Sequence, residues 1–207
     1  YAAKRQAGDP VMVPSYRPDK ALAAEDPVAW NAYIARLSAA ADQTISSYAE
    51  LVSALDKRHA AFHALGCRAS DHALIAPVAT FVTAERLQAI FAKLLNKVTP
   101  DQEEIDAFRT ALLLEVGRMN ARRGWAMQLH MGCIRNLNAP MFAKLGPDTG
   151  FDAVTDERIA RNLGLFMNAL QVVRWANVQG VPAGPIATVA DVVPVLQEHV
   201  RQLGLQP

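Results

Sequence analysis

The sequence predicts an α/β fold with parallel strands. Short segments of strand length lie at residues 11–13, 67–72 and 125–131, of which the first and the last are largely apolar, and longer stretches with apolar residues at helical spacing separate them. Strands that alternate with helices in this way pair in parallel through right-handed crossovers. Because two helices are expected between the second and third strands, the simple strand–helix alternation carries an inserted helix pair.

The first strand is expected at residues 11–13, where a valine-rich run ends at Pro14 and a polar loop follows. Asp26 and Pro27 are typical of a helix start, because aspartate caps free backbone N–H groups and proline suits the first helical turn. Apolar residues then recur at helical spacing, and they predict a helix that reaches about Ala40.

The second strand follows a second helix. Ser47 and Glu50 match a capping box, and the helix that they start ends at Gly66. Residues 67–72 are too few for a helix and end in charged groups, so we expect a strand there, with functional side chains at its end.

Two further helices precede the third strand. Thr83 is the expected cap of the first, and residues 99–102 combine a cap, a first-turn proline and a capping-box glutamine for the next. That long helix ends at Gly124, and residues 125–131 then form an apolar strand apart from Gln128 and His130.

The last part of the chain differs in kind. After a loop rich in glycine, proline and aspartate, a helix is expected from Asp156. Val172 and Val173 could begin a strand, residues 180–185 have the composition of a loop, and residues 191–203 have a helical pattern. We therefore treat residues 171–207 as a separate tail of uncertain origin, a loop followed by a helix.

Composition limits the classes of function. The chain has 207 residues, of which 51% are hydrophobic and 20% charged, with a formal net charge of +1. These values are typical of a globular protein, and such a charge argues against a nucleic-acid or acidic-membrane partner. No apolar run approaches the ~20 residues of a membrane span, and the first ten residues lack the apolar core of a signal peptide. We expect a cytoplasmic enzyme.

Three sequence blocks carry a family resemblance. PSYRPDKAL, GCRASDH and WAMQLHMGCIRN…MFAKLGPDTGFD resemble, in this order, the third-, fourth- and fifth-strand motifs of the uronate (glucuronate) isomerases. This family is related to the amidohydrolases and has a (β/α)8 (TIM) barrel fold. The resemblance implies that residues 1–170 form a partial barrel of the middle strands. A whole barrel takes about 250 residues, so we expect the chain, which starts at Tyr1 without a methionine, to be a piece of a longer protein.

The resemblance also implies an activity and a site. The family interconverts D-glucuronate with D-fructuronate and D-galacturonate with D-tagaturonate, which needs acid–base groups and a cationic anchor for the substrate carboxylate. For catalysis we expect His130 and Asp71. For substrate binding we expect Arg17, Arg68, His72 and Arg135. Purely structural roles stay open for three of these residues: a surface position for Arg17, an ion pair of Arg68 with Asp71, and a loop cap for Arg135.

A divalent metal, with zinc as one candidate, is implied by the resemblance, but its ligands are not in this chain. The family's first-strand His-x-His pair and last-strand aspartate motif have no counterpart here. The loop also departs from the family at Leu137, Ala139 and Pro140, where the family is more polar. We therefore expect the isolated chain to be inactive, with His-x-His encoded upstream in the full gene.

Two alternatives belong to other classes. A non-catalytic α/β barrel fragment would carry every one of these motifs. A CoA-transferase-like binding module would depend on the tail alone, where GVPAGPIATVADV is faintly similar to a segment of that class. Separately from these alternatives, we expect homo-oligomerisation, because open strand edges favour self-association.

Overall fold

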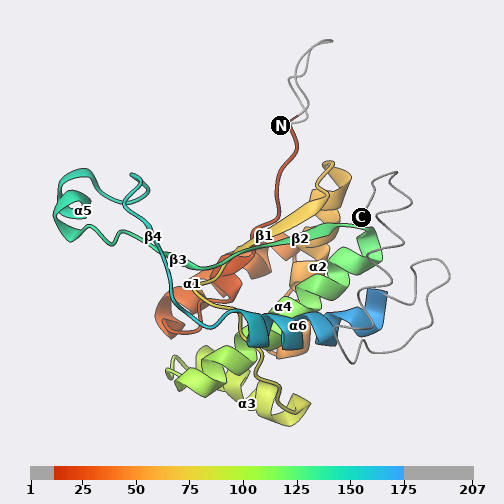
Figure 1. Cartoon of the computed structure of the whole chain (residues 1–207). Coiled ribbons are helices and arrows are strands. Elements are labelled where there is room, and N and C mark those ends of the chain that lie inside the picture. The colour runs from red at the N-terminus through yellow and green to blue at the C-terminus, as the bar shows by residue number, and fades with distance from the viewer. Residues whose placement is uncertain (1–11, 175–207) are drawn as a thin grey trace, which may run out of the picture. The chain divides into compact units, whose positions relative to one another are not determined.

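The computed structural model describes residues 12–174 (Figure 1). The chain divides into two compact units, Tyr1–Phe166 and Met167–Pro207. Of the second unit, only the final turns of helix α6 (Ala160–Arg174) are described. Val172 and Val173 belong to this helix, so the strand suggested for them is wrong. The rest of the predicted tail lies outside the described residues.

Parallel strands form the centre of the first unit, as predicted. Strand β1 (Ala69–Ala73) pairs in parallel with β2 (Ala126–His130), with Asp71 opposite Gln128. A single parallel bridge joins Tyr16 to Ser70 on the other edge of β1. Within residues 12–174 these strands form an open ladder and not a closed barrel.

The prediction of a strand at residues 11–13 is wrong for the part that the structure describes. Met12 and Val13 are exposed and unpaired, and the chain joins the ladder at Tyr16 instead. The N–H of Tyr16 donates to Ala69 O at 3.1 Å, and its carbonyl accepts from Asp71 N at 2.9 Å. Its buried ring also contacts Trp125 edge-on, which gives this position more apolar burial than either aliphatic residue obtains.

The helices begin where local caps predict them. Helices α1 (Pro27–Ala41), α2 (Tyr48–Ala64) and α3 (Ala84–Leu95) are capped by Asp26, Ser47 and Thr83. Helix α4 (Gln102–Arg123) is the exception, because its capping box is formed by Asp101 and Glu104 and not by Thr99 and Gln102. Helices α3 and α4 both lie between β1 and β2, as the predicted helix pair requires.

Helix α4 organises the core. It contacts α2, α3 and both parallel strands. Trp30 of α1 packs edge-on against Phe91 and Phe108, with ring centroids 5.6 and 6.0 Å apart. Each fully buried large apolar side chain contributes about 1.5–3 kcal/mol to folding, so this cluster holds α1, α3 and α4 in fixed positions behind the strands. No helix of the described chain is long and apolar enough to cross a membrane.

A hairpin follows the parallel strands. Strands β3 (Cys133–Ile134) and β4 (Ala153–Val154) pair antiparallel, and helix α5 (Ala139–Leu145) lies at the far end of the hairpin (Figure 1). The sequence predicts only a loop here, and α5 was missed. Helix α6 begins at Ala160 and not at the predicted Asp156, and strand β4 ends at Val154.

Candidate active site

Three predicted site residues meet at the carboxyl ends of the parallel strands. Arg17 follows the bridging residue Tyr16, Asp71 lies on β1, and His130 is the last residue of β2. The Arg17 Nε atom lies 3.0 Å from Asp71 Oδ2, and His130 Nδ1 lies 3.2 Å from Asp71 Oδ1. Both contacts are ion-pair distances without hydrogen-bond geometry, and Oδ1 of Asp71 is buried without a hydrogen-bond partner.

The alternation of the strands explains this meeting. Successive side chains of a strand point to opposite faces, so Asp71 projects to one face while Ser70 and His72 project to the other. The register places Ala73 opposite His130 and Asp71 opposite Gln128, so the last two strand positions on one face carry the polar groups. Asp71 is only 14% exposed, whereas Arg17 and His130 are about half exposed and reachable by a ligand.

A contact with Gln128 helps to orient the ring of His130. The Gln128 side-chain nitrogen meets Nε2 of His130. Nδ1 is then the ring nitrogen that faces the Asp71 carboxylate.

His72 lies on β1, and its side chain is fully buried on the face opposite that of Asp71. Its Nε2 atom contacts Ser70 Oγ at 2.9 Å, and its Nδ1 atom faces Asp19 Oδ1 at 3.5 Å. Burial raises the pKa of Asp19, but the interactions with His72 and with the N–H of Ala73 outweigh burial and leave that pKa below its usual value. Asp19 was not predicted as a site residue, and it lines a cavity of about 540 Å³ next to the end of β1.

Arg135 has two environments. Its Nη1 atom lies 2.7 Å from Asp152 Oδ2, and this carboxylate raises the pKa of Arg135. Asp152 also accepts from the N–H of Asn136, which ties together the two sides of the hairpin. Arg135 lines a cavity of about 350 Å³ together with His130 and Cys133. The structure thus supports the loop-cap reading and also brings Arg135 to the cavity that His130 lines.

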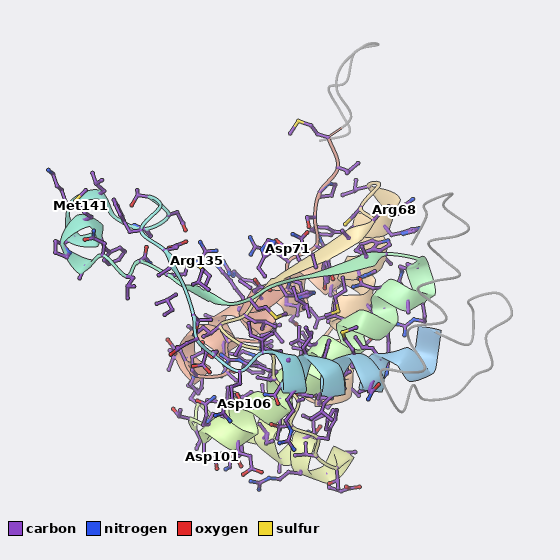
Figure 2. The ribbon with its side chains drawn as sticks, in the orientation of Figure 1. Arg68, Asp71, Asp101, Asp106, Arg135 and Met141 are labelled. Atoms are coloured by element: carbon purple, nitrogen blue, oxygen red, sulfur yellow. The ribbon has the colours of Figure 1, made fainter. Side chains whose placement is uncertain are left out.

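Arg68 is not brought to this group. Its Nη1 atom donates to the carbonyls of Cys67 at 2.7 Å and His63 at 3.1 Å, at the amino end of β1. Figure 2 shows Arg68 on one side of Asp71 along the strand and Arg135 on the other. The ion pair considered for Arg68 and Asp71 is not formed, because Asp71 faces Arg17 and His130 instead.

Comparisons with known proteins now decide the family. A family model described as glucuronate isomerase matches residues 2–175. The chain belongs to the glucuronate isomerase family. It is 42% identical over 161 residues to the uronate isomerase of Bacteroides thetaiotaomicron and 40% identical over 159 residues to that of Cellvibrio japonicus. These matches cover 78% and 77% of this chain but 34% of each relative, so the chain spans about a third of their length.

Solved structures agree with this membership. The crystal structure of uronate isomerase from Thermotoga maritima superposes with a TM-score of 0.70 at 32% identity, over 78% of this chain and 36% of that one. Glucuronate isomerase from Caulobacter crescentus gives a TM-score of 0.64 at 25% identity, over 75% of this chain and 32% of that one. The described part of this glucuronate isomerase family chain thus has the mixed α/β arrangement of its relatives.

The divalent metal implied by the family does not fit the described residues. Between residues 12 and 174, no group of three or more His, Cys, Asp or Glu side chains is placed to hold a metal ion. The pairs Asp19–His72 and Asp71–His130 offer two donor side chains each, below the three protein ligands usual at a catalytic zinc.

Sequence reasoning missed a buried polar network behind this site. Asn120 of α4 donates to Ser70 Oγ at 2.7 Å and accepts from His59 Nε2 at 2.8 Å. His59 also stacks on Trp125, with 3.7 Å between ring centroids. One signal was present: Asn120 occupies the apolar face of its helix next to Met119, and a polar residue there needs partners.

Proposed function

We propose that this chain is the middle part of a uronate isomerase, covering about the third to fifth strand–helix units of a (β/α)8 barrel with an inserted helix pair. Its whole protein would act in the cytoplasm on D-glucuronate and D-galacturonate, giving D-fructuronate and D-tagaturonate. The observation that carries the proposal is the convergence of Arg17, Asp71 and His130 at the carboxyl ends of parallel strands, where barrel enzymes hold their active sites.

In this proposal His130 moves the proton. Isomerisation transfers a proton between C2 and C1 of the uronate, and an imidazole is well suited to take and return it near neutral pH. Once the contact between Gln128 and Nε2 of His130 opens, Nε2 would exchange the proton with the substrate. The Asp71 carboxylate beside Nδ1 would balance the resulting positive charge on the ring. Such general acid–base groups contribute about 10²–10⁴-fold to rate.

The arginines anchor the substrate. Arg17 is half exposed and has one face turned to Asp71, so its remaining N–H groups can meet a uronate carboxylate. Arg135 could do the same from the cavity that it shares with His130, after exchanging Asp152 for the substrate. His72, on the buried face of β1 opposite Asp71, supports these site residues. We leave Arg68 out because its guanidinium is bound to backbone carbonyls at the other end of the strand.

A chimera tests the proposal. Residues 12–166 would replace the matching third of the Bacteroides thetaiotaomicron uronate isomerase, and glucuronate conversion would be followed in a coupled assay. We expect measurable isomerase activity in the chimera and a loss of about 10²–10⁴-fold in kcat on His130→Gln. An Arg68→Gln chimera is the matched control and should keep its KM. A folded chimera whose activity is indifferent to His130→Gln would refute the proposal.

The isolated chain provides a second test. We expect it to form no fructuronate at an enzyme-like rate, since it spans about a third of the length of its relatives. Turnover by the isolated chain would contradict this expectation. Absence of activity in both the isolated chain and the folded chimera would favour the alternative of a non-catalytic α/β segment.

A further inference from the structure

A line of buried polar side chains runs from helix α2 through β1 to the loop that carries Arg17. It consists of His59, Asn120, Ser70, His72 and Asp19. The first four are at most 2% exposed, so each must satisfy its polar atoms inside the protein. The line ends at Asp19, whose Oδ1 atom and the facing Nδ1 atom of His72 have no hydrogen-bond partner.

The position of each proton can be followed along this line. The Asn120 carbonyl oxygen can only accept, so His59 Nε2 donates to it, and the Asn120 amide nitrogen donates to Ser70 Oγ. The Ser70 hydroxyl hydrogen then points to His72 Nε2, the only other polar atom bonded to it among the described residues. His72 is therefore protonated on Nδ1, the atom that faces the Asp19 carboxylate at 3.5 Å.

The opposite tautomer is disfavoured on electrostatic grounds. It would turn the Nδ1 lone pair toward a carboxylate oxygen inside a buried site, where both atoms carry negative charge and no water screens them. It would also leave the Ser70 hydroxyl hydrogen without an acceptor at a position that is fully buried. Turning the Asn120 amide over would reverse the direction of the whole line, and the Asp19 carboxylate disfavours that reversal, so Asp19 selects the tautomer of His72.

Asp19 also connects the buried line to the proposed site. Its Oδ2 atom accepts from the N–H of Ala73 at 3.2 Å and lies 3.5 Å from Nη2 of Arg17. Arg17 is the residue whose Nε atom meets Asp71 at 3.0 Å. One carboxylate therefore ties the loop after Tyr16 to the end of β1 and fixes the side on which Arg17 presents its guanidinium.

We propose that Asp19 is a positioning residue, which holds His72 as the Nδ1–H tautomer and keeps Arg17 aligned with Asp71. The part that concerns Arg17 deepens the proposed function and rests on it. The part that concerns His72 does not depend on any activity.

The first experiment uses the unmodified chain. Imidazole ¹⁵N shifts, recorded by long-range ¹H–¹⁵N NMR and assigned with His72→Gln, report which ring nitrogen carries the proton. We expect a protonated Nδ1 and an unprotonated Nε2 for His72. The reverse pattern would overturn the proposal without any variant of Asp19 having to fold.

The second experiment compares Asp19→Asn with Glu25→Gln. Glu25 lines the same cavity as Asp19 and is exposed, so its variant removes the same charge without touching His72. We expect Asp19→Asn to convert His72 to a mixture of tautomers and to shift the Arg17 Nε–H resonance, while Glu25→Gln leaves both unchanged. Unchanged His72 and Arg17 signals in a folded Asp19→Asn chain would contradict the proposal, because a merely structural loss would not move the tautomer.

Titration with D-glucuronate separates the two proposals. We expect Asp19→Asn to weaken binding by about tenfold, equal to about 1.4 kcal/mol, and Glu25→Gln to leave it unchanged. If the unmodified chain binds no glucuronate while His72 shows the expected tautomer, the proposed function loses support and the role of Asp19 toward His72 stands. Binding that Asp19→Asn leaves unaltered would refute the alignment of Arg17.

Discussion

Replacement of Asn120 by leucine tests how much the buried network stabilises the strands under the site. Leucine has the branched skeleton of asparagine without its polar atoms, and because its methyl groups need more room, any overpacking adds to the loss estimated here. His59 Nε2–H would lose its partner inside a fully buried site, and its Nδ1 atom already has none. An orphaned buried donor costs about 1–3 kcal/mol, and the lost bond to Ser70 adds about 1 kcal/mol. We expect Asn120→Leu to lower the free energy of unfolding by about 2–4 kcal/mol, the sum of these two effects.

Urea unfolding followed by tryptophan fluorescence measures this change, because Trp125 stacks directly on His59. The matched control is Asn96→Leu. Asn96 is exposed and donates only to Ala92 O, so we expect a change of at most about 0.5 kcal/mol. Equal unfolding free energies for Asn120→Leu and the unmodified chain would refute the reasoning.

Asn120→Asp tests the direction in which the stability of the fold changes with pH. Burial lowers the pKa of His59, and a carboxylate at the Asn120 position, 2.8 Å from Nε2, would raise it. A raised histidine pKa stabilises the fold below the unfolded pKa, and this gain is lost as the pH rises through the folded pKa. Asn120→Asp should therefore be less destabilising at pH about 5 than at pH about 8, where the unfolded histidine pKa of about 6.5 separates the two conditions. Equal destabilisation at both would contradict the contact.

Two further stability predictions concern helix α4. Glu104 is buried, and it pairs with Lys93 and Arg86, which are about half exposed. Glu104→Gln should therefore lower the free energy of unfolding by about 2 kcal/mol. Glu103→Gln, on the exposed side of the same turn, should change that free energy by less than about 0.5 kcal/mol. Chiefly through the hydrogen bond from Lys93, the pKa of Glu104 is lowered from 4.5, so this difference should shrink as the pH falls below 4.5 in acid-unfolding curves. Gly124→Ala should cost about 1 kcal/mol in thermal unfolding because its φ is +68°, and Gly164→Ala, with no neighbour within 4 Å, should be neutral or stabilising.

The parts of the fold that the sequence predicts well depend on neighbours in the chain. The caps at Asp26, Ser47 and Thr83 satisfy N–H groups two or three residues away, so their residue types alone indicate a helix start. Tyr16 joins β1 through backbone bonds to residues more than fifty positions later, which no local pattern records. Helix α5 was missed for another reason: it spans two turns, has no buried residue, and follows a loop-like composition.

The candidate site likewise combines residues that local sequence predicts with residues that only the tertiary structure brings together, and one strand boundary was misplaced. The predicted strand at 67–72 placed Arg68 within the strand, whereas the observed β1 begins at Ala69. Arg68 therefore precedes the amino end of β1, about 10 Å along the strand from Asp71 at ~3.3 Å per residue. Functional groups of parallel strands gather at the carboxyl end, so a residue that precedes the amino end of β1 is not expected beside Asp71 and His130. Asp19 lies beyond such reasoning, because it meets His72 across more than fifty residues of sequence, through the tertiary arrangement of β1 and the loop after Tyr16.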